Sequence, residues 1–394
     1  MTEFDPITYQ DSGVNYDLMD PFKKACQQSA LPTGQNINRF QQYDLKVVEV
    51  TRSRGETAFE VEITTTRPRS LRIAHVEEGL GTKNEVANQL RELQSKIDLA
   101  TQLAPTYGSA LYRGVAIDNA AMVFNDLSTV GASPVSFMLH VAAYPSSWFA
   151  DEGRTRDLIA GTVDANNQAR CAWGGGESPA LRDIINEGHS LLSGSAWGLK
   201  FPEYNGEMDP KNIMEQDRII LFGSSGPHSN GITLLRGEVL NRLPNGYETL
   251  LPDGKSYAEA LLTPTTIYSE LIDELYARQV GIKYATQISG HGWRKIMRAP
   301  QDLTYVIDKI PQPQPIFELV QDITGMSDEQ IYGDYNMGAG LAIMVERYYV
   351  DMSLRVAERL GIPALDAGHV EQGPKRVIID PLGVEFNADS LNLR

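Results

Sequence analysis

Two carboxylates and a carboxamide recur at helical spacing within residues 117–131, IDNAAMVFNDLSTVG. In a helix, Val123, Leu127 and Val130 would form an apolar stripe for a core. The opposite face would carry Asp118, Met122, Asn125 and Asp126. Asp118 is expected at the N-cap. Such a face suits a hydrated Mg²⁺ ion, which one or two carboxylates and substrate phosphates usually hold. The other interpretation is a surface helix with a solvated polar face.

Glycine-bearing segments, each expected to follow a strand, are a second source of chemistry. They are EGLGTK (78–83), GGGES (174–178), GSSGPHSNG (223–231) and the pair ISGHGW (288–293) with YNMGAG (335–340). Glycine permits positive φ and lets backbone amides approach an anion. Each segment taken alone is more often a plain turn. The P-loop and GxGxxG signatures are absent, which excludes P-loop enzymes and ordinary Rossmann dehydrogenases.

Single residues in these segments have a chemical and a structural interpretation. Lys83, with Thr82, is placed to meet a phosphate, or is a solvated lysine at a helix start. Acidic residues beside the glycine turns either join Asp118 and Asp126 around a metal or are exposed turn residues; they are Glu77, Glu78 and Glu177.

Among the six histidines, His228 lies in the densest polar and glycine-rich loop. There it is a candidate general acid, general base or phosphate donor, and His291 is a second candidate. No HxxxH or HExxH spacing occurs, so a zinc site is not expected.

Composition bounds the class of protein. A length of 394 residues suggests two or three domains, and 51 acidic against 35 basic residues give a net charge of −16. This balance argues against a general binder of nucleic acid or anionic membranes. With only Cys26 and Cys171, no disulfide framework is expected. The absence of a signal sequence and of an apolar span predicts a soluble, cytoplasmic protein.

Periodicity predicts strands alternating with helices in both halves of the chain, and hence two α/β domains. Expected strands are 72–76, 110–117, 135–143, 190–198, 218–222, 284–288, 304–307, 341–345 and 376–379, with a charged hairpin at 44–66. Expected helices are 17–30, 85–100, 117–131, 147–168, 232–242, 266–279 and 350–360. The helix at 147–168 is expected to have Leu158, Ile159 and Val163 along one apolar side. The polar stretch 201–216 marks the expected boundary, which gives an arm at 1–40 and domains at 41–205 and 206–394.

Taken in order, these segments resemble the aminoimidazole ribonucleotide synthetase family, also called phosphoribosylformylglycinamidine cyclo-ligase. The collinear match also includes YQDSGVNYD (9–17), GASP (131–134), LTPTTIY (262–268) and YNMGAGLAI (335–343), and it covers nearly the full length. The resemblance implies a two-domain, PurM-like fold with mixed sheets, in which the N-terminal domain dimerises and a cleft lies between the domains. It implies an ATP- and Mg²⁺-dependent closure of an imidazole ring in purine synthesis, with release of ADP and phosphate.

The resemblance also assigns roles to individual residues. It places nucleotide-binding residues at Gly79, Gly81, Thr82, Lys83, Asp118, Met122, Asn125, Gly175 and Gly176. It places Mg²⁺ ligands at Glu78, Asp118, Asp126 and Glu177, and substrate contacts at Ser225, His228, Ser229 and Asn230. His228, Asp126 and Lys83 would act in catalysis.

This chain departs from the family pattern at several positions. Glu78 stands where the family usually has aspartate, Leu139 where it often has an acid, and SPALRD (178–183) follows the GGE triplet (175–177) instead of TAEMPG. The charged hairpin at 44–72 replaces a glycine-rich segment. Two alternatives therefore remain: a superfamily relative that uses ATP on a different amide or phosphorylated substrate, and a nucleotide-binding regulatory or scaffold protein without turnover.

Overall fold

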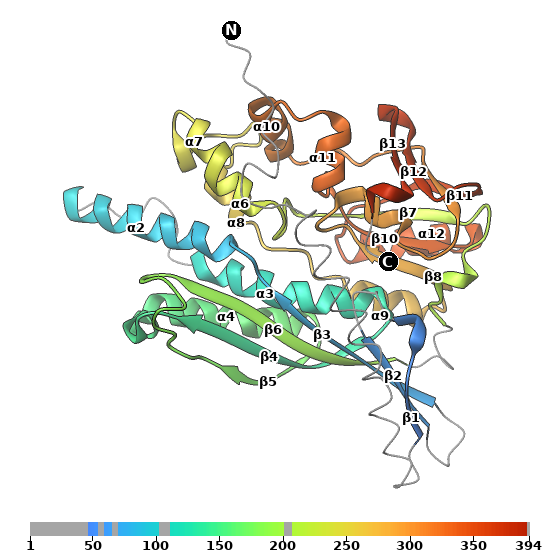
Figure 1. The fold of residues 1–394 in the computed structure, drawn as a ribbon, viewed down its shortest axis with the longest axis horizontal. Helices are drawn as coiled ribbons and strands as arrows, with labels where there is room; N and C mark the ends of the chain where they lie inside the picture. Colours follow the sequence, from blue (N-terminus) through green and yellow to red (C-terminus); the bar gives the residue numbers. More distant parts are fainter. Residues whose placement is uncertain (1–45, 54–58, 65–69, 102–110, 201–206, 392–394) are drawn as a thin grey trace.

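The fold contains two mixed sheets with helices between and around them (Figure 1). It is seen in a computed structural model that describes residues 46–53, 59–64, 70–101, 111–200 and 207–391. The strands of one sheet all precede residue 201, and those of the other all follow residue 217. The expected arm at 1–40, the motif at 9–17, the helix at 17–30 and Cys26 lie outside the described residues. Among the described residues, no helix is both long and apolar enough to cross a bilayer.

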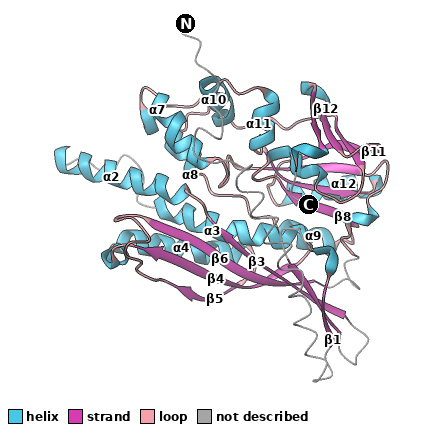
Figure 2. Ribbon diagram, viewed as in Figure 1, coloured by secondary structure: helices cyan, strands magenta, loops and turns pink. Residues whose placement is uncertain are grey.

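The first half builds a six-stranded sheet. Its elements are β1 (Lys46–Glu49), η3 (Thr51–Ser53), β2 (Phe59–Thr64), β3 (Ser70–Gly79), α2 (Lys83–Thr101), α3 (Leu111–Thr129), β4 (Ser133–Ala143), η4 (Ser146–Ala150), α4 (Glu152–Gln168), β5 (Ala172–Glu177) and β6 (Ser190–Lys200). The strand order is β1-β2-β3-β6-β4-β5, antiparallel except for the parallel pair β4 and β5. Helices α3 and α4 lie against one face of this sheet (Figure 2). The pairing of β1 with β2 confirms the predicted hairpin.

Helix α3 corrects two predictions about the central stretch. It begins at Leu111, so Asp118 lies inside the helix instead of capping it, and the strand predicted at 110–117 is wrong. The helix runs between the first sheet and the second half of the molecule, and nearly every residue in it is buried. A helix that is buried on all sides has no amphipathic period, so the sequence pattern of residues 110–117 could not distinguish a helix from a strand. The predicted stripe of Val123, Leu127 and Val130 is confirmed as part of the core.

Helix α4 crosses α3 at Gly161. A Cβ atom built at Gly161 would lie 2.1 Å from the carbonyl oxygen of Arg113, so the two backbones can approach only without a side chain there. The buried side of α4 contains Leu158, Gly161, Thr162 and Ala165. The predicted apolar side is therefore wrong in part, because Ile159 and Val163 are 54% and 43% exposed.

The second half builds a seven-stranded sheet in the order β13-β12-β9-β11-β7-β10-β8. Its strands are β7 (Arg218–Gly223), β8 (Ile282–Gln287), β9 (Leu303–Ile307), β10 (Ala339–Val345), β11 (Ala364–Gln372), β12 (Arg376–Ile379) and β13 (Val384–Asn387). Its α-helices are α6 (Ile232–Leu234), α7 (Leu240–Arg242), α8 (Tyr257–Leu262), α9 (Ser269–Ala277), α10 (Pro315–Thr324), α11 (Asp328–Asp334) and α12 (Val350–Arg359). Shorter helical segments are η5 (Pro210–Asn212), η6 (Leu235–Val239), η7 (Gly246–Glu248), η8 (Gly292–Met297), η9 (Arg347–Tyr349), η10 (Asp380–Leu382) and η11 (Ala388–Ser390).

Three of these strands bring glycine loops together. Strand β10 pairs antiparallel with both β7 and β8, so the ends of β7 and β8 lie at the same edge as the start of β10. The loops at 223–231, 288–293 and 335–340 therefore meet at that edge. The prediction that every glycine segment follows a strand is wrong for two of them, because YNMGAG leads into β10 and GGGES lies largely within β5.

Candidate functional site

A buried ion pair joins the start of α2 to the middle of α3. The Nζ atom of Lys83 lies 2.9 Å from Oδ1 and 2.8 Å from Oδ2 of Asp118, and neither side chain is exposed. Lys83 Nζ also donates to the carbonyl oxygen of Thr263 at 2.8 Å, and Asp118 Oδ1 accepts from the backbone N–H (2.8 Å) and Oγ1 (2.5 Å) of Thr265. Burial lowers the pKa of Lys83 and raises the pKa of Asp118, while each partner's charge opposes the shift of the other.

A second side chain of α3, Asn125, forms hydrogen bonds with segment 262–268, LTPTTIY. Asn125 donates from Nδ2 to the carbonyl oxygen of Thr266 at 2.8 Å and accepts from the backbone N–H of Tyr268 at 2.8 Å. On its other side, the carbonyl oxygen of Pro264 accepts from Oγ of Ser225 at 2.5 Å. Segment 262–268 thus lies between α3 of the first half and the loop at 223–231 of the second half.

Asp126 faces Glu78 at the end of β3. Burial and this neighbouring carboxyl, with which it shares a hydrogen bond, raise the pKa of Asp126 well above its usual range. The positive charges of Lys295 and Arg298 act in the opposite direction. Met122, one turn earlier on α3, is also nearly buried at 9% exposure.

Two adjacent carboxyls fit the chemistry of a Mg²⁺ site, because Mg²⁺ takes oxygen ligands and often only one or two carboxylates. Among the described residues, no group of three or more His, Cys, Asp or Glu side chains is arranged to hold a metal. Any ion here would therefore take its remaining ligands from water or from phosphate oxygens.

The loop at 223–231 buries His228 completely, with a positive φ of 59°. Its Nε2 atom accepts from the backbone N–H of Ser225 at 3.1 Å, so the neutral ring carries its proton on Nδ1. Nδ1 has no hydrogen-bond partner among the described residues. Burial and the charge of Lys83 lower the pKa of His228 to about 3, so the imidazole is uncharged at neutral pH.

Two further polar atoms of this loop are buried without a partner among the described residues: Oγ of Ser229 and Nδ2 of Asn230. The Oδ1 atom of Asn230 accepts from the backbone N–H of Gly290 at 3.0 Å, which joins this loop to the one after β8. Together with His228, the loop presents polar groups whose hydrogen-bonding capacity the described residues do not use.

The turn at 79–82 is open around its glycines. No atom lies within 4 Å of a Cβ built at Gly79 or at Gly81, and Gly81 has a φ of 79°. The hydroxyl of Thr82 lies 3.0 Å from that of Thr233, at the start of α6, which is another contact between the two halves.

Glu177 lies apart from the other predicted metal ligands. It is exposed at the end of β5, opposite His140 in the register with β4. Glu77, Gly176 and Glu177 line a hollow of about 270 Å³ on the sheet face away from α3. Because successive strand residues point to opposite faces, Glu77 belongs to this hollow while Glu78 faces Asp126. Gly175, which has a φ of 140°, belongs to the same strand.

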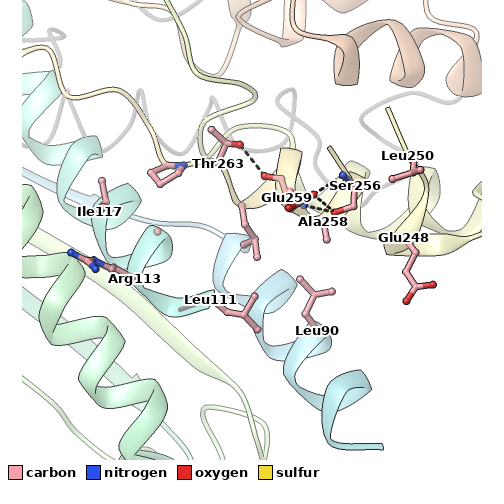
Figure 3. A pocket seen from close by; sticks show the side chains of 13 residues that line it. Leu90, Leu111, Arg113, Ile117, Glu248, Leu250, Ser256, Ala258, Glu259 and Thr263 are labelled. Carbon is pink, nitrogen blue, oxygen red and sulfur yellow. Dashed lines mark hydrogen bonds between the residues drawn. The ribbon is translucent and has the colours of Figure 1, made fainter. Parts of the chain in front are cut away.

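A larger cavity of about 730 Å³ opens beside the ion pair (Figure 3). Its walls are mainly apolar and come from α2, α3 and α8, including Leu90, Leu111, Ile117 and Leu262. Thr263 forms part of one wall, and its carbonyl oxygen is the one that accepts from Lys83. The volume lies within the range of small-molecule sites.

The structure thus brings together many, but not all, of the residues singled out in the sequence. Lys83, Asp118 and His228 lie close together, Asp126 meets Glu78, and Glu177 is on another face. Sequence reasoning named the segment LTPTTIY without giving Thr263 or Thr265 a role. It also missed Lys295 and Arg298, which no motif marked.

Comparison with known proteins agrees with the resemblance. Residues 91–199 match the family model "AIR synthase related protein, N-terminal domain". A phosphoribosylformylglycinamidine cyclo-ligase of Methanococcus maripaludis is 31% identical over 261 residues, which cover 65% of this chain and 71% of that relative. A protein of the same name from Methanothermobacter thermautotrophicus is 29% identical over 352 residues, covering 89% of this chain and 91% of the relative.

Solved structures show the same fold at lower identity. Thiamine-monophosphate kinase from Stenotrophomonas maltophilia matches with a TM-score of 0.54 and 17% identity, over 82% of this chain and 90% of that one. A chain of the HypE-HypF complex matches with a TM-score of 0.54 and 14% identity, over 85% and 93%. T. maritima PurL complexed with ADP matches with a TM-score of 0.51 and 15% identity, over 82% of this chain and 44% of that one. The fold is therefore PurM-like, and with the sequence relatives in hand the chain belongs to the phosphoribosylformylglycinamidine cyclo-ligase family.

Proposed function

We propose that this protein is an ATP-dependent cyclo-ligase that converts formylglycinamidine ribonucleotide to aminoimidazole ribonucleotide, with release of ADP and phosphate, in purine biosynthesis. The observation that carries the proposal is the contact of Lys83 with Asp118 and Thr263, because it unites three of the segments that resemble the family across both halves. The names of the relatives support the reaction, and the fold neighbour complexed with ADP supports the use of ATP.

Phosphoryl transfer depends mainly on charge neutralisation and alignment. Glu78 and Asp126 would hold Mg²⁺, which when bound neutralises the charge of the triphosphate. The open turn of Gly79 and Gly81 leaves room for phosphate oxygens beside Thr82. Lys83 and Asp118, which form a buried ion pair, would act by fixing this turn against α3 and segment 262–268.

The loop of Ser225, His228, Ser229 and Asn230 would bind the ribonucleotide substrate. The γ-phosphoryl group of ATP is transferred to the formyl oxygen, an amidine nitrogen then bonds to the formyl carbon, and phosphate leaves. The neutral His228 would donate from Nδ1 to an oxygen of the substrate. Because its pKa is lowered, His228 would orient and polarise the substrate without carrying a positive charge.

We also propose that the protein is a homodimer and works in the cytoplasm, where ATP is available. The face of the first sheet away from α3 exposes large apolar side chains, namely Met138 (44%), Leu191 (50%) and Trp197 (37%). Exposed apolar groups gathered on one face are typical of a protein interface. A second copy packed there would also cover the hollow lined by Gly176 and Glu177.

The test is an assay that measures ADP release and imidazole product from formylglycinamidine ribonucleotide with ATP and Mg²⁺. The proposal expects both products in equal amounts, dependent on the amide substrate. Absence of turnover while a thermal shift still reports ATP binding would reject the cyclo-ligase, since a ligand that binds only the folded state raises its apparent stability. That result would favour a relative acting on a different substrate.

A further inference from the structure

Gln287, the last residue of β8, is a buried carboxamide that the described residues do not satisfy. Its side chain is 1% exposed, and neither Oε1 nor Nε2 has a hydrogen-bond partner among the described residues. Leaving a buried donor or acceptor unpaired is costly, and most such groups in folded proteins are paired. A glutamine in this state therefore has room for a partner that the described part of the chain does not supply.

The register of the sheet places Gln287 beside the candidate site. Gln287 pairs with Leu341 of β10, and Leu341 pairs with Phe222 of β7, so these side chains share one face of the sheet. Phe222 and Leu341 belong to the core cluster that also contains Tyr268, at the end of segment 262–268. Helix α3 packs against β8 as well. Gln287 thus lies on the face of the sheet against which Tyr268 of segment 262–268 packs.

The neighbouring backbone links Gln287 to the loop of His228. The N–H of Ile288 donates to the carbonyl oxygen of Gly340 at 2.9 Å. A Cβ built at Gly340 would lie 2.7 Å from Cε1 of His228, so that ring sits directly against the start of β10. The N–H of Gly290 in turn bonds Asn230. The unpaired atoms of Gln287 and of the loop at 228–230 therefore gather at the same edge of the second sheet.

The chemistry of a carboxamide limits what it can pair with. Gln287 offers an N–H donor and a C=O acceptor side by side. A phosphate presents acceptors alone and an ammonium group presents donors alone, so each leaves one of the two atoms unpaired. A secondary amide held in its cis form presents one acceptor and one donor on the same edge and satisfies both, and so does the edge of an adenine ring.

We infer that Gln287 is a specificity-determining residue that binds the formyl amide of the substrate, with its Nε2 donating to the formyl oxygen and its Oε1 accepting from the amide N–H. The inference rests on the proposed function and deepens it. The formyl amide fits better than adenine because the unpaired atoms at the same edge of the sheet belong to the loop at 228–230, which the proposed function assigns to the amide substrate.

The experiment compares Gln287→Met with the wild-type enzyme in three readouts: KM for formylglycinamidine ribonucleotide, KM for ATP, and apparent Tm without ligands. Methionine fills similar space and removes both unsatisfied atoms. The inference expects the KM for the amide substrate to rise at least tenfold and the KM for ATP to stay within twofold. It expects a Tm equal to or above that of the wild type, since replacing an unsatisfied buried polar group relieves its desolvation cost.

Thr286→Val is the matched control. Thr286 is the adjacent residue of the same strand, is equally buried and points to the opposite face. The Thr286→Val substitution should leave both KM values unchanged.

A lower Tm with unchanged KM values for Gln287→Met would overturn the inference by giving the residue a structural role. A rise confined to the KM for ATP would overturn it and would indicate that Gln287 binds the adenine ring instead. Wild-type enzyme without turnover would count against the proposed function instead, and calorimetric titration of the amide substrate into both proteins would then test Gln287. Equal affinity of the wild type and Gln287→Met for the amide substrate would refute the role of Gln287.

Discussion

Lys83 Nζ lies 2.8 Å from Asp118 Oδ2 with both side chains fully buried, which ties the turn at 79–82 to the centre of α3. The same ammonium group reaches the backbone of Thr263 in the second half of the chain. A single pair of opposite charges thus fixes three segments that are far apart in sequence. This anchor holds the open glycine turn near the loop of His228.

Breaking this ion pair should destabilise the fold strongly. We expect Lys83→Met or Asp118→Leu alone to lower the free energy of unfolding by about 3–5 kcal/mol, because each leaves an unpaired buried charge. The double variant should recover part of that loss. Urea denaturation of the wild type, both single variants and the double variant measures the coupling. Asp164→Asn, in the exposed pair of Arg113 with Asp164, is the control and should have no measurable effect. Additive losses would show that the pair is not coupled.

His228 should make stability depend on pH. Its folded pKa of about 3 lies below the unfolded value of 6.5, so between these values the unfolded state binds the extra proton. Its contribution is therefore present above pH 6.5 and is lost as pH falls through that window, at no more than about 1.4 kcal/mol per unit. Denaturation at pH 7, 6, 5 and 4 should show a shallower loss for His228→Gln than for the wild type. Equal slopes would contradict a neutral buried imidazole.

The carboxyls of Asp126 and Glu78 should respond to Mg²⁺. Because the folded pKa of Asp126 is raised, stability without metal should fall as pH rises through that folded value. Asp126→Asn should remove this loss while lowering Mg²⁺-dependent turnover at least tenfold, which is about 1.4 kcal/mol in the barrier. Thermal shifts with and without Mg²⁺, alongside turnover, measure both effects. A variant that keeps both its Mg²⁺ response and its activity would remove Asp126 from the site.

Gly161 should tolerate no side chain. Gly161→Ala would drive a methyl group against the carbonyl oxygen of Arg113 and separate α3 from α4, with an expected loss of about 2 kcal/mol or more in the free energy of unfolding. Gly153→Ala is the matched control on the same helix. The atom nearest its Cβ lies 3.5 Å away, so helix propensity alone should leave it unchanged or slightly more stable. Similar losses in both variants would refute the close crossing.

The open face of the first sheet should mediate dimerisation. Trp197→Glu places a charge among the exposed apolar side chains of this face and should shift the mass in light scattering from dimer to monomer. Ile159→Glu removes a comparably exposed apolar group on α4, on the other side of the sheet, and should leave the mass unchanged. A dimer that survives the Trp197 substitution would place the interface elsewhere.

The sequence predicted elements best where local pattern and tertiary environment agree. The alternation in β2 and the apolar run in β4 each have the period of a strand, and the predicted hairpin and strand are both present. Leu111 to Ile117 has no such signal, because a helix buried on all sides lacks a polar face. Strand β11, ALDAGHVEQ, was not predicted, since its polar residues hide a strand that pairs with β7 and β9 inside the sheet.

Local sequence pattern was limited in the same way for the candidate site. The type and spacing of Asp118, Asn125 and Asp126 marked α3 as important, yet all three are buried, and two of them bond to segment 262–268. Those partners depend on how the two halves pack, which one-dimensional spacing does not encode. Gln287 carries no motif at all, and its two buried polar atoms without a partner among the described residues can be recognised only from the structure.

The measurement that tests the central claim most directly is turnover of formylglycinamidine ribonucleotide by the wild-type protein with ATP and Mg²⁺. The account predicts one ADP and one imidazole product per substrate consumed, and a loss of at least tenfold in Asp126→Asn and in His228→Gln. Nucleotide binding with no imidazole product, or full activity in both variants, would contradict it.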